Sequence, residues 1–115
     1  MNESPPDWAL EFPGGVTIAG KDCTILYLND KAAKTFASDG GKSLIGKDLM
    51  ACHNDRSKTI IRRIMETEEP NVYTIEKKGV KKLIYQAPWY KDGELGGLVE
   101  LSLEIPFEMP HYKRD

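Results

Sequence analysis

The sequence predicts an α+β domain in which a five-stranded antiparallel sheet carries short helices packed on one face. Two observations predict this class: the segments follow the order strand, strand, a block of short helices and three strands, and apolar residues alternate with polar ones along the last strands. The helical block separates the two strand groups, so both must meet in space if one sheet is to cover one core. The space between helices and sheet is then the natural place for a ligand.

Length, charge and cysteine usage limit the class of protein further. The 115 residues suffice for one domain, and 16 Lys and Arg against 18 Asp and Glu give a net charge of −2. The basic footprint that nucleic-acid binding needs is missing. No apolar run approaches the ~20 residues of a membrane span, and the start of the chain is no signal peptide. Cys23 and Cys52 form no disulfide framework, so we expect a cytoplasmic protein with reduced thiols and with neither nucleic acid nor a membrane as its partner.

The first thirty residues predict a short turn and a hairpin. Asp7 can cap a single helical turn, and Pro13 with two glycines then breaks the chain. Residues 16–19 and 24–28 are rich in β-branched and apolar side chains on either side of a polar turn. This pattern predicts two antiparallel strands.

Two helical regions follow the hairpin. Asn29 or Asp30 caps a predicted helix over 30–37, which is built from good helix formers, and we therefore assign Asn29 a structural, helix-capping role. A clearer helix runs from Asn54 or Asp55 to about residue 68, because apolar residues recur there at helical spacing and Pro70 follows.

The last third of the chain predicts three strands, over 71–77, 81–90 and 95–105. Asp92 and Gly93 form a strong hairpin signal, and Pro88 predicts a bulge or an outward-facing position. The strands carry one apolar row, which we expect to face the helices: Leu83, Tyr85, Ala87, Trp89, Val99, Leu101, Leu103 and Ile105. Glu100, Ser102 and Glu104 then lie on the opposite face.

The order of these elements, together with three short motifs, resembles a PAS sensory domain. The motifs are residues 25–33 (ILYLNDKAA), residues 44–49 (LIGKDL), and the Asp92-Gly93 hairpin followed by residues 97–99 (GLV). The resemblance covers roughly residues 8–105. It implies a PAS-like sensory domain over 16–105, an N-terminal cap segment over 1–15 and a C-terminal tail over 106–115.

The chain departs from the PAS pattern at both ends of the domain. PAS hairpins usually carry Asp at the position of Gly20 and Gly at that of Cys23. The last strand usually ends in a sequence like Arg-Asp-Ile-Thr and leads into a signalling helix, whereas Pro106 and Pro110 break any such helix here. The chain is thus either a free-standing sensor or a domain cut from a longer protein, and Met1 favours the former.

We expect the ligand-binding residues between the long helix and the sheet: Leu49, His53, Ile64, Tyr73, Tyr85, Trp89 and Leu101. Thiolate and imidazole are ligands for zinc and haem iron, which draws attention to the adjacent Cys52 and His53. Two adjacent residues do not make a zinc site, so we expect no metal site. In PAS domains a His at this position usually forms local hydrogen bonds at the helix entrance. The alternative is that the protein binds haem as a cofactor and that His53 ligates its iron.

The sequence contains none of the catalytic motifs Gly-x-Ser-x-Gly, P-loop or His-Glu-x-x-His, and we predict no enzyme. By the PAS resemblance, Trp8 and Phe12 are expected at a homodimer interface. The predicted function is a bacterial-type PAS sensory domain that binds a small ligand or cofactor, dimerises and acts on an output protein that the sequence does not identify. The alternatives are a ligand-free dimerisation or scaffold module of the same fold and a haem-binding gas or redox sensor.

Overall fold

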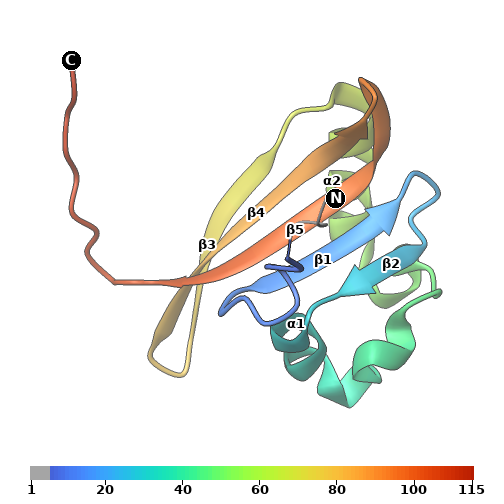
Figure 1. Cartoon of the computed structure of the whole chain (residues 1–115), viewed down its shortest axis with the longest axis horizontal. Coiled ribbons are helices and arrows are strands. Elements are labelled where there is room, and N and C mark those ends of the chain that lie inside the picture. The colour runs from blue at the N-terminus through green and yellow to red at the C-terminus, as the bar shows by residue number, and fades with distance from the viewer. Residues whose placement is uncertain (1–5) are drawn as a thin grey trace, which may run out of the picture.

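The computed structural model describes residues 6–115, so residues 1–5 of the expected cap segment lie outside the described part. Figure 1 shows a twisted sheet with helices on one side. The strands are β1 (Gly15–Gly20), β2 (Ile25–Leu28), β3 (Asn71–Lys77), β4 (Val80–Lys91) and β5 (Glu94–Ile105). The helices are α1 (Asp30–Thr35), α2 (Asp55–Thr67) and the short 3-10 helices η1 (Ala37–Asp39), η2 (Gly41–Leu44) and η3 (Leu49–Cys52).

The five strands form one antiparallel sheet in the order β2-β1-β5-β4-β3. β1 pairs with β5, from Gly15 opposite Ser102 to Gly20 opposite Gly97. This pairing joins the first two strands to the last three across the intervening helices. The predicted α+β class with a five-stranded antiparallel sheet is therefore confirmed.

Local sequence explains where the helices start and stop. Asn29 accepts from the N–H of Ala32 at the start of α1, and Asn54 accepts from that of Ser57 at the start of α2. α2 ends at Glu68, whose φ of 60° is left-handed, shortly before Pro70. The predicted helix over 30–37 is shorter in the structure, because α1 ends at Thr35 and the 3-10 helix η1 follows.

The turns between the last three strands have the backbone that a tight hairpin needs. Lys78 and Gly79 have φ values of 52° and 78°, and Asp92 and Gly93 have 52° and 80°. Two successive left-handed residues match the twist of the strands that they connect. The register of β4 and β5 shifts just after Pro88, between Trp89 and Tyr90, where the sequence predicts a bulge.

The buried core lies between the sheet and the helices in two apolar clusters. One joins Ala19 and Leu98 of the sheet to Ile61 and Ile64 of α2. The other joins β2 to α1 and η2 and contains Ile25, Leu28, Ala32 and Leu44. The first cluster fixes the position of α2 over β1 and β5.

The strand register shows that the expected orientation of the sheet is wrong. Ala19 and Leu98 pack on α2, and Gln86 and Glu100 line a space beside Ile61 of that helix, so this row faces the helices. Side chains alternate along a strand, so the apolar row that contains Tyr85, Leu101 and Leu103 faces away. The physical reason is that the helix-facing row retains polar side chains around a cavity, while the N-terminal segment covers part of the apolar row.

The N-terminal segment, residues 6–14, lies on the face opposite α2, in front of the sheet in Figure 1. The side chains of Phe12 and Leu103 both lie against Gly14. The rings of Trp8 and Phe12 meet edge to face, with centroids 5.6 Å apart. Asp7 accepts from the N–H of Leu10, as expected for a capped turn.

Asn29 connects this segment to the rest of the fold and is fully buried. Its Oδ1 accepts from the N–H groups of Val16 and Ala32, each at 2.9 Å. Its Nδ2 donates to the carbonyls of Ala9 and Gly14, each at 2.8 Å. One side chain thus holds the N-terminal segment, the start of β1 and the start of α1.

Residues 106–115 contain no helix or strand and lead away from the sheet in Figure 1, in keeping with the expected effect of Pro106 and Pro110. Within residues 6–115, no helix combines the length and the apolar composition that crossing a membrane requires.

Candidate functional site

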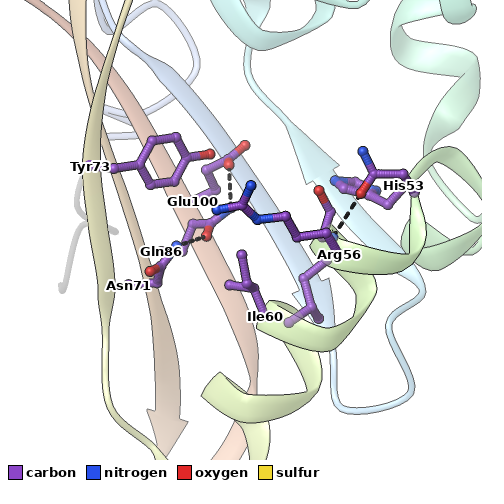
Figure 2. Close-up of a pocket in the computed structure, with 10 residues that line it drawn as sticks. His53, Arg56, Ile60, Asn71, Tyr73, Gln86 and Glu100 are labelled. Carbon is purple, nitrogen blue, oxygen red and sulfur yellow. Dashed lines mark hydrogen bonds between the residues drawn. The ribbon is translucent and has the colours of Figure 1, made fainter.

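A cavity of about 420 Å³ lies between α2 and the helix-facing side of the sheet. Figure 2 shows Asn71, Tyr73, Gln86 and Glu100 reaching into it from the strands, with His53, Arg56 and Ile60 on the helical side. The remaining lining residues are Asn54, Ser57 and Ile61. Its volume lies in the range of small-molecule sites.

The floor of the cavity is a polar row that crosses four strands. The strand register places Thr17, Glu100, Gln86 and Asn71 opposite one another on β1, β5, β4 and β3. Asn71 Nδ2 donates to Gln86 Oε1 at 3.0 Å, and Gln86 Nε2 donates to Glu100 Oε1 at 2.8 Å (Figure 2). Because an ionised carboxylate only accepts, Glu100 fixes the direction in which both amides donate.

The helical wall is built at the junction of η3 and α2. His53 follows η3, and its Nδ1 lies 2.7 Å from the carbonyl oxygen of Leu49. A carbonyl cannot donate, so Nδ1 carries a proton, and in the neutral tautomer that has this proton Nε2 is the free nitrogen. Arg56, Ser57 and Ile60 follow on the first turns of α2.

Three further spaces of about 310, 120 and 10 Å³ adjoin the cavity and share part of its lining. His53 and Glu100 line all of them as well as the main cavity. These two residues come from the helical wall and from the sheet. They therefore mark the centre of the site.

Tyr73 combines partial burial with a carboxylate nearby. Removal from water raises the pKa of the Tyr73 hydroxyl, and the nearby carboxylate of Glu100 raises it further. The hydroxyl therefore stays protonated at neutral pH and can donate a hydrogen bond. Burial also raises the pKa of the Cys23 thiol, with Asp48 and Asp22 adding to the effect, so this thiol is not activated as a nucleophile.

The residues expected to bind a ligand fall into three groups. His53 and Tyr73 line the main cavity, and Leu49 lines two of the adjoining spaces. Ile64 is buried in the cluster that holds α2 on the sheet and is not part of the lining. Tyr85 and Leu101 lie on the opposite face of the sheet.

Trp89 has a structural contact in place of the expected pocket contact. Its Nε1 donates to the carbonyl oxygen of Ala19 at 2.9 Å, and its ring lies against Gly96. A side chain at Gly96 would overlap that ring. Trp89 thus ties β4 to β1 across β5 and does not line the cavity.

Sequence reasoning missed most of the polar lining, namely Arg56, Ser57, Asn71, Gln86 and Glu100. Gln86 gave a usable signal, because it is a lone polar residue between Tyr85 and Ala87 in the apolar middle of a strand. Glu100 similarly lies between Val99 and Leu101. The alternation predicts that Glu100 lies on the face opposite the helices, whereas both Gln86 and Glu100 line the cavity under α2.

The lining does not suit haem, although His53 has one property of an axial ligand, a second ring nitrogen held by a carbonyl. The opposite wall of the main cavity consists of Asn71, Tyr73, Gln86 and Glu100. An apolar macrocycle placed there would bury a carboxylate and two amides without new hydrogen-bond partners, which is costly. Among the side chains that the structure describes, no group of three or more His, Cys, Asp or Glu residues could hold a metal ion. The donors and acceptors present match a small polar molecule.

No protein-family model matches the chain. No curated protein matches it either. Among solved structures, the Aer2 receptor of Vibrio cholerae, a dual PAS-heme oxygen sensor, is similar with a TM-score of 0.61 and 20% identity over 81% of this chain and 95% of that chain. The PAS domain of the histidine kinase ThkA has a TM-score of 0.63 and 20% identity over 78% and 97%.

A third similar structure is that of the VqmA dimer of Vibrio cholerae, with a TM-score of 0.66 and 14% identity over 86% of this chain and 49% of that chain. These similarities, together with the observed strand order, show that the chain has the PAS fold.

Proposed function

We propose that this PAS-fold chain is a non-enzymatic sensory domain that binds a small polar molecule in the cavity between α2 and the sheet. The observation that carries the proposal is the hydrogen-bonded row Asn71, Gln86 and Glu100 on the floor of a cavity of about 420 Å³. From the cysteine usage we further propose that the protein works in the reducing cytoplasm.

The cost of the polar row supports a binding role. Polar groups on the buried side of a sheet weaken the core unless each has a partner, and apolar residues would pack against α2 instead. In this chain the row is placed where the core would otherwise continue from Ala19 and Leu98. Residues that lower packing quality at a cavity are expected where function requires them.

We also propose that occupancy is passed on through a homodimer. The face opposite the cavity carries exposed apolar side chains, among them Tyr85 at 38% and Val72 at 49% exposure, and the exposed Trp8 belongs to the segment on the same face. The similar VqmA forms a dimer. A ligand can shift such an assembly only by binding one arrangement more tightly than another, and an output protein would respond to that arrangement.

A ligand-free dimerisation module is the second candidate, favoured by the same apolar face. Ligand binding distinguishes the two functions. We would titrate ¹⁵N-labelled protein with a library of small polar metabolites and follow the backbone amides of His53 and Glu100 and the side-chain amides of Asn71 and Gln86. We expect at least one compound to shift these signals in a saturable manner.

Two tryptophan variants on α2 make this test specific to the cavity. Ser57→Trp places a large ring in the lining and should abolish the shifts, whereas Thr59→Trp, on the exposed side of the same helix, should leave them intact. If no metabolite shifts the cavity signals, or if Ser57→Trp binds as well as the unaltered protein, the ligand-free module is the correct function.

A further inference from the structure

The hydrogen-bonding pattern at the centre of the cavity restricts the chemical class of its ligand, given the proposed function. His53 and Glu100 are the two residues common to the cavity and its adjoining spaces. They approach from the helical wall and from β5. A bound molecule that fills the centre must contact both.

Both residues present acceptors to that centre. His53 Nδ1–H is committed to the carbonyl of Leu49, which leaves the lone pair of Nε2 on the neutral ring. Glu100 Oε1 accepts from Gln86, and of the side chains described in the structure no other donates to the carboxylate and no cationic group lies within ion-pair distance of it. Glu100 Oε2 therefore remains free to accept.

The side-chain amides of Asn71 and Gln86 support the carboxylate of Glu100 as an acceptor. Asn71 donates to Gln86 and Gln86 donates to Glu100, so both amides direct N–H groups toward the carboxylate and support its negative charge. These two hydrogen bonds leave Asn71 Oδ1 as a further acceptor at the outer end of the row. Glu100 thus places a negative charge and a free acceptor at the centre of the site.

Two positive groups lie near this arrangement. Arg56 lines the main cavity and is exposed, and Figure 2 shows its guanidinium extending from α2 toward the floor that holds Gln86 and Glu100, so a ligand on Glu100 must share the cavity with this side chain or displace it. Lys82 lines the adjoining space of about 310 Å³ but not the main cavity. Neither forms an ion pair with Glu100.

We infer that the ligand is a small organic cation with N–H donors, an amine or an amidine, whose charged group binds between His53 Nε2 and Glu100 Oε2. This inference rests on the proposed function, since it names the class of molecule that the cavity binds. A charged donor gives stronger hydrogen bonds to a carboxylate than a neutral one, and the partly desolvated site strengthens the attraction.

The test uses three isosteric probes that differ in charge: benzamidine as the cation, benzamide as the neutral amide and benzoate as the anion. Each is titrated into the ¹⁵N-labelled full chain, and the Kd is read from the side-chain amide signals of Asn71 and Gln86. We expect benzamidine to bind about tenfold or more tighter than benzamide, because hydrogen bonds to charged groups are stronger by that order. Benzoate should bind most weakly.

Two variants assign the preference to the carboxylate. Glu100→Gln keeps the shape of the side chain and removes its charge, so the preference for benzamidine over benzamide should disappear. Glu94→Gln, at the exposed start of β5, should keep the preference. Dispersed spectra confirm that each variant is folded, and the three-probe comparison on the unaltered chain needs no variant at all.

The inference is overturned if benzamide or benzoate binds as tightly as benzamidine, if no probe shifts the cavity signals, or if Glu100→Gln retains the full preference. None of these results decides the proposed sensory function. That function is tested separately by the metabolite titration and its Ser57→Trp control. A neutral or anionic metabolite that bound in that titration would support the sensory function and contradict the cationic class.

Discussion

Asn29 shows how much of this fold depends on one buried side chain. A helix cap requires only that Oδ1 accept from Ala32, and the same atom also accepts from Val16. The two donors on Nδ2 hold the carbonyls of Ala9 and Gly14, which belong to the N-terminal segment. The residue therefore uses its acceptor and both of its donors.

We predict that Asn29→Ala lowers the free energy of unfolding by about 3 kcal/mol, because buried partners on three segments lose their hydrogen bonds. Asn54→Ala, which removes an exposed cap with one hydrogen bond, should cost only about 1 kcal/mol. Urea unfolding monitored by circular dichroism measures both values. Equal losses in the two variants would show that Asn29 acts as an ordinary cap.

The sequence predicts the capping role of Asn29 but not its contacts with Ala9 and Gly14. A cap is a local feature that depends on neighbours within three residues, and the pattern around 29–32 contains it. The contacts with the N-terminal segment join residues 15 and 20 positions apart. Such contacts depend on the path of the chain, which no local pattern records.

At the scale of elements, the junction of β1 and β5 depends on a glycine. Gly97 faces Gly20 in the register, and a Cβ at Gly97 would overlap the carbonyl oxygen of Ala19. The two strands approach closely here because both residues of this pair lack a side chain. This junction also joins the two strand groups, so weakening it affects the whole sheet.

We predict that Gly97→Ala lowers the free energy of unfolding at least twice as much as Gly79→Ala. Gly79 has a φ of 78° and open space around its Cα, so its substitution costs only the left-handed backbone strain of about 1–2 kcal/mol. Urea unfolding at one temperature gives both values. A Gly97→Ala variant as stable as Gly79→Ala would mean that β1 and β5 separate without loss.

The elements were predictable from the sequence, whereas the orientation of the sheet was not. Period-two alternation shows that Tyr85 and Leu101 share a face, but it does not show which face the helices cover. The usual assumption that the more apolar row is buried fails because Gln86 and Glu100 line a cavity under α2. Where a binding site needs polar groups, the row that faces the helices carries them, and the more apolar row is then the one that faces away.

At the scale of the whole molecule, the sheet separates two surfaces of different chemistry. The helix-facing surface holds the polar cavity around His53 and Glu100. The other surface carries Tyr85 and Val72 in an apolar row, with the N-terminal segment beside them. One layer of strands lies between these surfaces, and Glu100 is flanked in β5 by Val99 and Leu101, whose side chains lie on the other face.

A second copy of the chain is the partner that we propose for the apolar face. A stable interface removes about 800 Å² of surface from each partner. Tyrosine and tryptophan contribute strongly to such interfaces. Tyr85 and Trp8, exposed at 38% and 65%, are the residues on which dimerisation should depend most.

We therefore predict that the protein is a dimer in analytical ultracentrifugation at micromolar concentration, and that Tyr85→Glu or Trp8→Ala raises the dissociation constant about tenfold or more. Trp8→Ala is preferable to deleting the segment, because deletion would also remove the hydrogen bond from Asn29 to Ala9 and unsettle the fold. Ile45→Glu is the matched control, since Ile45 is 41% exposed but follows η2, away from the sheet face. The control should remain dimeric. A monomeric unaltered protein, or dissociation by Ile45→Glu alone, would show that the apolar face serves a different partner.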